Sequence, residues 1–229
     1  MNNHRLASLR PAANRLITNR FTGAPLVRLV TLYLRSRLLG TALAVMIASA
    51  YVGWYLLDQS TDPGITKILL IMAPVGAATA IGISARSPFG ETERITSFRL
   101  PALRLGHMAA LLAVAAVALA WANGAESDAW TDWVMVRNLA GYAGLSLLTA
   151  RLLGPSISWL PPVAYAMATF IAIGGIQFDD LTDNQRRWGW PVVPGDDRFA
   201  AWTVGLVLAA GLFLVCTGGG RDRVEENAA

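Results

Sequence analysis

Six long stretches of the chain are almost entirely apolar, and they constrain its fold more than any other feature. They are residues 38–57, 65–83, 105–122, 134–153, 159–176 and 200–216. A helix needs about 20 mostly apolar residues to cross a hydrocarbon core, and each stretch reaches or approaches that length. The stretches do not alternate apolar with polar residues as barrel strands do, so a backbone in lipid would satisfy its hydrogen bonds as a helix. The sequence therefore predicts an all-α polytopic membrane protein with six transmembrane helices.

Composition agrees with this class and argues against several others. Hydrophobic residues make up 54% and charged residues only 15% of the 229 residues. Soluble domains contain about 25% charged residues, and disordered chains have low hydrophobicity. The single cysteine, Cys216, excludes a disulfide framework. With only two histidines besides, the chain has few of the side chains that usually bind zinc. We therefore predict no metal site.

The distribution of basic residues predicts the orientation of the helices. If the N-terminus is cytoplasmic, 14 of the 19 lysines and arginines lie in cytoplasmic segments; the others are Lys67, Arg137, Arg186, Arg187 and Arg198. Positive residues concentrate on the cytoplasmic side of a membrane. The expected arrangement is a multi-pass protein of the cell membrane with both termini in the cytoplasm. The net charge of +4 then reflects topology, and we predict no nucleic-acid partner.

Tryptophans gather at the predicted outer ends of the spans. Only Trp159 of the eight lies at an inner end. Indole rings favour the headgroup level, so most of these residues are predicted to be anchors. The outer loop 177–199 is long for a helix bundle and has three interpretations. It forms a lid, or it dips into the bilayer through Trp188–Val193, or its tryptophans only touch headgroups.

Three segments are predicted to lie on the cytoplasmic side. Residues 1–37 form an Arg-rich tail with an interfacial helix at Pro25–Arg35, and residues 218–229 form a second tail. The loop between the second and third spans predicts a short helix at Glu91–Phe98. Its charged and aromatic residues are candidates for docking into a partner: Phe89, Glu91, Glu93, Arg94 and Phe98. The alternative is a plain connector with a capped turn.

The fourth predicted span carries the polar residues that most need an explanation. Arg137 and Arg151 lie near its opposite ends and can extend to the two interfaces. Alternatively, Arg137 faces a cavity and meets an anionic substrate or an outer-loop acid. Tyr142, Ser146 and Thr149 of the same span are candidates for lining a transport pathway.

The chain lacks the sequence patterns of the common enzymes and ion-coupled transporters. It contains no Gly-x-x-x-x-Gly-Lys-Ser/Thr, no His-Glu-x-x-His and no Gly-x-Ser-x-Gly, so we predict no catalytic residues and no enzyme. The span interiors also lack acidic residues, which proton or sodium coupling would normally require. Energy for uphill transport would therefore have to come from another subunit.

Three stretches, 87–94, 137–154 and 158–165, together with the layout of nearly the whole chain, resemble the six-span permease subunits of ABC-2-type ABC transporters, especially compact actinobacterial ones. The resemblance implies an elbow helix matching Pro25–Arg35 and a coupling helix matching Glu91–Phe98. It also implies a re-entrant outer segment within Phe178–Phe199. It further implies two permease copies and two separate ATPase subunits, which would carry the ATP and Mg²⁺.

The function expected from these observations and from the resemblance is that of a permease subunit of an exporter, with substrate moving between two protomers. Two alternatives stay open at this point. One is a non-transporting scaffold or regulatory subunit of the membrane. The other is the substrate-binding subunit of an energy-coupled importer, which would bind a small ligand as an isolated chain.

Overall fold

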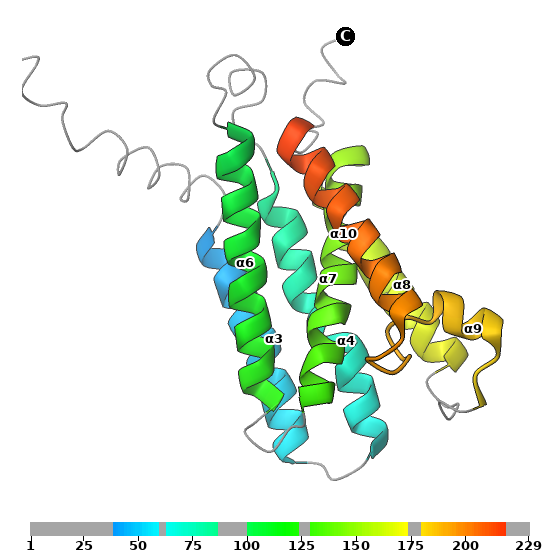
Figure 1. The fold of residues 1–229 in the computed structure, drawn as a ribbon. Helices are drawn as coiled ribbons and strands as arrows, with labels where there is room; N and C mark the ends of the chain where they lie inside the picture. Colours follow the sequence, from blue (N-terminus) through cyan, green and yellow to red (C-terminus); the bar gives the residue numbers. More distant parts are fainter. Residues whose placement is uncertain (1–38, 60–62, 87–99, 124–128, 174–179, 219–229) are drawn as a thin grey trace, which may run out of the picture. The chain divides into compact units, whose positions relative to one another are not determined.

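The computed structural model describes residues 39–59, 63–86, 100–123, 129–173 and 180–218 (Figure 1). Within these ranges the regular elements are helices, and no strand occurs among them. The predicted all-α class is therefore confirmed for the described part of the chain. The expected elbow helix at Pro25–Arg35 and the expected coupling helix at Glu91–Phe98 lie outside the described residues.

Six long helices of the described part of the chain coincide with the six apolar stretches. Most of the helix ends lie within a few residues of the ends of the stretches. They are α3 (Leu39–Asp58), α4 (Pro63–Ser84), α6 (Leu100–Asn123), α7 (Ala129–Leu152), α8 (Leu160–Ile173) and α10 (Arg198–Gly218). Five segments are long and apolar enough to cross a membrane: α3, α4, α6, α10, and α8 together with the short helix before it. The described helices thus fit a multi-pass membrane protein.

Helix α7 corresponds to the remaining predicted span, and it differs from the others in composition. It has 24 residues, which is long enough to cross a bilayer, but it is less apolar and is not one of the five. Arg137, Asn138 and Arg151 are among the residues that lower its hydropathy. This helix is nevertheless the most enclosed of the described helices, because its residues from Met135 to Ala150 are buried or half-buried.

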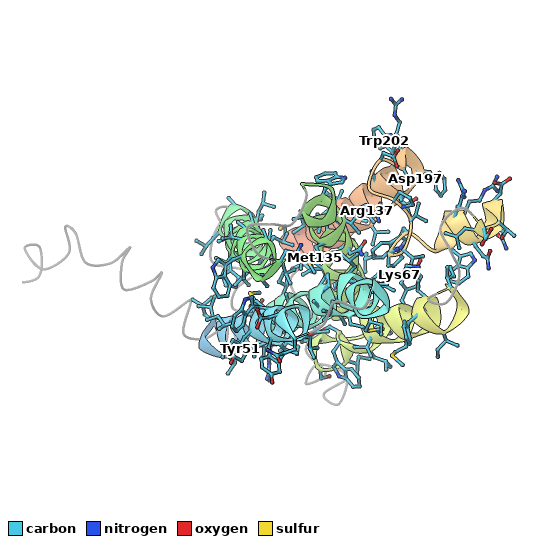
Figure 2. The ribbon with its side chains drawn as sticks, turned by 90° about the horizontal axis from the view of Figure 1, so that it is seen from below. Tyr51, Lys67, Met135, Arg137, Asp197 and Trp202 are labelled. Carbon is cyan, nitrogen blue, oxygen red and sulfur yellow. The ribbon has the colours of Figure 1, made fainter. Side chains whose placement is uncertain are left out.

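The other helices surround α7, which explains how it tolerates polar residues. It packs against α4, α6, α8 and α10, while α3 packs against α4 and α6. Viewed along the helices, Arg137 lies near the centre of the bundle, whereas Tyr51 of α3 and Trp202 of α10 lie at its periphery (Figure 2). Polar side chains in a membrane protein normally face the protein interior. The polar residues of α7 follow that rule.

Two glycines bring α7 and α10 into backbone contact. A Cβ atom added at Gly144 would lie 2.7 Å from the backbone nitrogen of Leu208, and one added at Gly211 would lie 2.8 Å from the carbonyl oxygen of Gly144. Small residues allow such close approach, which is how helices gain packing energy in lipid. Helix α10 runs obliquely across α7 (Figure 1).

A sharp reversal after α7 begins the path into α8. Gly154 has a φ of 105°, a conformation that favours glycine. The carbonyl oxygen of Thr149 accepts the backbone N–H groups of Leu153 and Gly154 at 2.8 and 3.1 Å, which closes the helix end. The short 3-10 helix η1 (Pro155–Ile157) follows. Pro161 and Pro162 then occupy the first turn of α8, where no N–H is required.

Candidate functional site

The segment between α8 and α10 folds back into the bundle, and it forms the candidate site together with α7. Its first part is the short exposed helix α9 (Asp183–Trp188), whose start is fixed by a capping box between Thr182 and Gln185. The chain then turns inward, and residues 189–195, which we name the inserted segment, are buried except for the half-buried Pro194. Asp197 follows the segment, and its carboxylate accepts the backbone N–H of Ala200 at 2.9 Å, which caps α10.

Arg137 of α7 holds the inserted segment through three backbone carbonyl groups. Its Nη1 donates to the oxygen of Pro194 at 2.8 Å, and its Nη2 donates to the oxygens of Trp190 and Val193 at 2.7 Å each. The side chain is only 3% exposed. A buried cation is costly unless it is hydrogen-bonded, and the planar guanidinium can meet several acceptors at once. The carboxylate of Asp197 adds a favourable electrostatic interaction.

Asn138 links the inserted segment to a proline in α4. Its Nδ2 donates to the carbonyl oxygen of Pro191 at 2.9 Å and to that of Leu70 at 3.0 Å. In an unbroken helix the Leu70 oxygen would accept the N–H of residue 74, but residue 74 is proline and has none. The Asn138 amide supplies the missing donor, which a backbone carbonyl in a membrane-embedded helix requires.

Aromatic rings fix the side chain of Trp190 between α7 and α8. The ring centroid of Trp190 lies 4.9 Å from that of Tyr142 and 5.4 Å from that of Tyr165, the latter pair being stacked. Such aromatic pairs add to the packing energy of a buried ring. Tyr165 Oη also donates to the carbonyl oxygen of Trp188. A side chain at Gly141 would overlap the Trp190 indole, so this glycine is required for the insertion.

Trp133 completes the contact from the edge of the site. Its Nε1 donates to the carbonyl oxygen of Gly195 at 3.0 Å, while about half of the side chain is exposed. Three buried polar atoms of α7 have no hydrogen-bond partner among the described residues: Arg137 Nε, Asn138 Oδ1 and Tyr142 Oη. The site thus holds a folded-back segment, and these three polar atoms beside it remain without a hydrogen bond to any described residue.

The residues predicted as pathway lining all lie on α7 and face the interior, but they have different partners. Arg137 and Tyr142 contact the inserted segment. Ser146 Oγ donates to the carbonyl oxygen of Ser158 at 2.9 Å, near the start of α8. Thr149 Oγ1 donates to the Leu145 oxygen one turn earlier in its own helix. The predicted partner-docking residues Phe89, Glu91, Glu93, Arg94 and Phe98 lie outside the described residues.

Two interpretations from the sequence are corrected by this geometry. The Arg137 side chain does not extend away from the bundle; it is buried, and it meets the segment between α8 and α10 through backbone carbonyls and through Asp197. Trp190 is not an interfacial anchor, because it is only 5% exposed. Trp54, Trp121, Trp133 and Trp202 do present exposed faces, as anchors should.

Asn138 and Tyr165 are site residues that the sequence reasoning missed. For Asn138 a signal existed, since it is the only asparagine within the six apolar stretches and α4 contains a proline that leaves a carbonyl unpaired. For Tyr165 no sequence signal was available, because its partners are a loop carbonyl and a distant tryptophan.

The hydrogen bonds and ring contacts of the site join the inserted segment to the helices around it. Among the described residues, no group of three or more His, Cys, Asp and Glu could hold a metal ion. What the described residues define is a helical membrane protein whose central helix binds a folded-back segment between α8 and α10. No family model, curated protein or solved structure matches the chain.

The pairing of Asn138 with the Leu70 carbonyl can be tested by a double-mutant cycle. We expect Asn138→Leu to lower the free energy of unfolding by about 1–3 kcal/mol, because it leaves buried carbonyls without a donor. Pro74→Ala restores an N–H that can reach Leu70, so in its presence Asn138→Leu should cost about 1 kcal/mol less. Unfolding in detergent can be followed by labelling of the buried Cys216 with a fluorogenic maleimide. Additive effects of the two substitutions would contradict the assignment.

Proposed function

We propose that this chain is the membrane-spanning permease subunit of an ATP-driven ABC transporter of the ABC-2 type. In this proposal it exports its substrate, acts as a pair of protomers and draws energy from separate ATPase subunits. The observation that carries the proposal is the inserted segment. The resemblance expects an outer segment that folds back between the last two spans, and residues 189–195 fold back onto α7 between α8 and α10.

The distribution of charge supports an external energy source. The apolar stretches contain no Asp or Glu, and the chain has no phosphate-binding loop. A subunit of this kind can neither couple to ions through an intramembrane carboxylate nor hydrolyse ATP by the P-loop route. Transport against a gradient would then depend on a partner that binds ATP and Mg²⁺.

The proposal assigns different roles to the two ends of the bundle. Glu91, Glu93, Arg94, Phe89 and Phe98 would receive the motion of the ATPase on the cytoplasmic side. Arg137 and Tyr142 would hold the outer closure, since the guanidinium of Arg137 donates to the inserted segment and the ring of Tyr142 packs against Trp190. Ser146 and Thr149 lie deeper on the same helix and would meet substrate only after the helices around α7 separate.

A purification from the native host tests the proposal. The tagged full-length chain is extracted in mild detergent, and the co-purifying proteins are identified by mass spectrometry. We expect a P-loop ATPase in stoichiometric amount, and we expect the double variant Glu91→Ala with Phe98→Ala to lose most of it. A matched control, Asp196→Ala with Phe199→Ala, removes one acid and one phenylalanine at the opposite end of the bundle and should retain the ATPase.

Two results would contradict the proposal. If no ATPase accompanies the wild-type chain, the permease function is wrong and the scaffold alternative follows. If the ATPase is retained equally by both double variants, the coupling helix does not lie at Glu91–Phe98.

A further inference from the structure

An apolar cavity lies beside the inserted segment, between α8 and α10. Its volume is about 300 Å³, and its walls come from α7, α8, α10 and the end of α9: Gly141, Leu145, Tyr165, Arg187, Trp188, Trp190, Thr203, Val204 and Val207. We name it the α8/α10 slot. Leu145, Tyr165, Thr203 and Val207 are half-buried, so the slot is open along one side. Cavities that hold small ligands have volumes of about 300–1,000 Å³, so the slot lies at the small end of that range.

A charged pocket adjoins the slot and shares one residue with it. This second cavity, of about 380 Å³, is lined by Asp183, Arg186, Arg187, Asp197 and Phe199. Arg187 borders both cavities, and its guanidinium has no hydrogen bond or ion pair with any residue that the structure describes. The charge of Asp197 is offset by Arg137 in the bundle interior. The two arginines and Asp183 therefore leave a net charge of +1 at this end of the slot.

The wall of the slot contains one unused hydroxyl group. Thr79, Thr149, Thr169 and Thr217 each donate to a carbonyl of the preceding turn of their own helix. The hydroxyl of Thr203 makes no such bond within the described part of the chain, and this residue lines the slot. It lies five residues after Arg198, which begins α10. A polar group near one end of an otherwise apolar slot suits a ligand that is polar at that end only.

We propose that the α8/α10 slot binds one membrane lipid with an anionic headgroup. The acyl chain lies between α8 and α10, the ester region reaches the Thr203 hydroxyl, and the phosphate pairs with Arg187 and Arg186. From Phe199 in the charged pocket to Val207 in the slot, the two cavities extend about 12 Å along α10, which carries a chain from the headgroup level into the hydrocarbon. Apolar contact alone gives little preference over bulk lipid, so the arginines provide the selectivity. This binding requires neither an ATPase nor transport.

Native mass spectrometry of the full-length chain tests the site. The protein is reconstituted in an equimolar mixture of phosphatidylglycerol and phosphatidylcholine with identical acyl chains, and the lipids that stay bound after extraction are counted. We expect one retained lipid, with phosphatidylglycerol enriched several-fold. Arg187→Gln should abolish the enrichment, whereas Arg198→Gln, which removes an exposed arginine outside both cavities, should preserve it.

A second pair of variants tests the slot itself. Val207→Trp fills the slot and should remove the retained lipid, whereas Leu206→Trp, at a neighbouring position that is 66% exposed, should not. Labelling of Cys216 in each variant reports whether the bundle is folded. Equal retention of the two lipids by the wild-type chain would overturn the headgroup assignment. Retention that is unchanged in folded Val207→Trp would overturn the slot.

Discussion

Replacement of Arg137 with methionine is expected to release the inserted segment and to destabilise the bundle strongly. The guanidinium donates to three backbone carbonyls, and methionine fills similar space without any donor. Buried carbonyls that lose their partners cost about 1–3 kcal/mol each, with partial recovery by relaxation. We expect a loss of roughly 3 kcal/mol, which lowers the thermal midpoint by about 10 °C. The stability of Arg137→Lys should lie between that of the wild-type chain and that of Arg137→Met, because one ammonium group cannot reproduce the planar fork of the guanidinium.

Two measurements follow the effect of Arg137→Met. Labelling of Cys216 during heating gives the thermal midpoint, and limited trypsin digestion at Arg186 and Arg187 reports whether the segment next to them is held in place. In the variant the thermal midpoint should fall, and trypsin should cleave at these arginines faster. The control is Arg151→Met, which removes a half-buried arginine at the other end of α7 and should leave trypsin cleavage at 186–187 unchanged. Equal digestion of both variants and the wild-type chain would show that Arg137 does not hold the segment.

Replacement of Trp190 with alanine is the second substitution expected to have a large effect. The indole packs against Tyr142 and Tyr165 and over Gly141, so its removal leaves a large void at the centre of the site. Truncation of a buried tryptophan costs about 3–5 kcal/mol in protein cores. Most of this is lost packing, which a membrane environment does not replace.

Trp202 of α10 provides the matched control for Trp190. Its side chain is 72% exposed, so Trp202→Ala should shift the thermal midpoint little. The comparison uses the same chemical change at two positions and the same Cys216 labelling readout. A similar small shift for both variants would show that Trp190 does not pack in the bundle.

The helices were largely predictable from the sequence because their signal is local. Each apolar run, such as 38–57 or 200–216, is bounded by charged or loop residues, and the observed α3 and α10 end within two residues of those bounds. Residue composition within one run determines this outcome. The position of α7 at the centre of the bundle is a different matter, because it depends on which helices surround it.

The site was only partly predictable because its contacts connect distant parts of the chain through backbone atoms. Arg137 was recognised as unusual, but its partners are carbonyl groups of residues 190, 193 and 194, and every residue type carries a carbonyl. No sequence pattern distinguishes those acceptors. Dipping of Trp188–Val193 into the bilayer was one of three interpretations of the loop. None of the three predicted that Trp190 is buried inside the bundle between two tyrosines.

The glycine contact between α7 and α10 has a mechanical consequence. Packed helices usually slide past one another by small rearrangements of interlocking side chains. At Gly144 and Gly211 the backbones themselves touch, so a shift along α7 would bring residues with a Cβ atom into a contact that has no room for one. We expect this point to act as a pivot: α10 can swing about it but cannot shift along α7. A swing would move the end of α10 at Arg198 the furthest, and that end is joined directly to the segment held by Arg137.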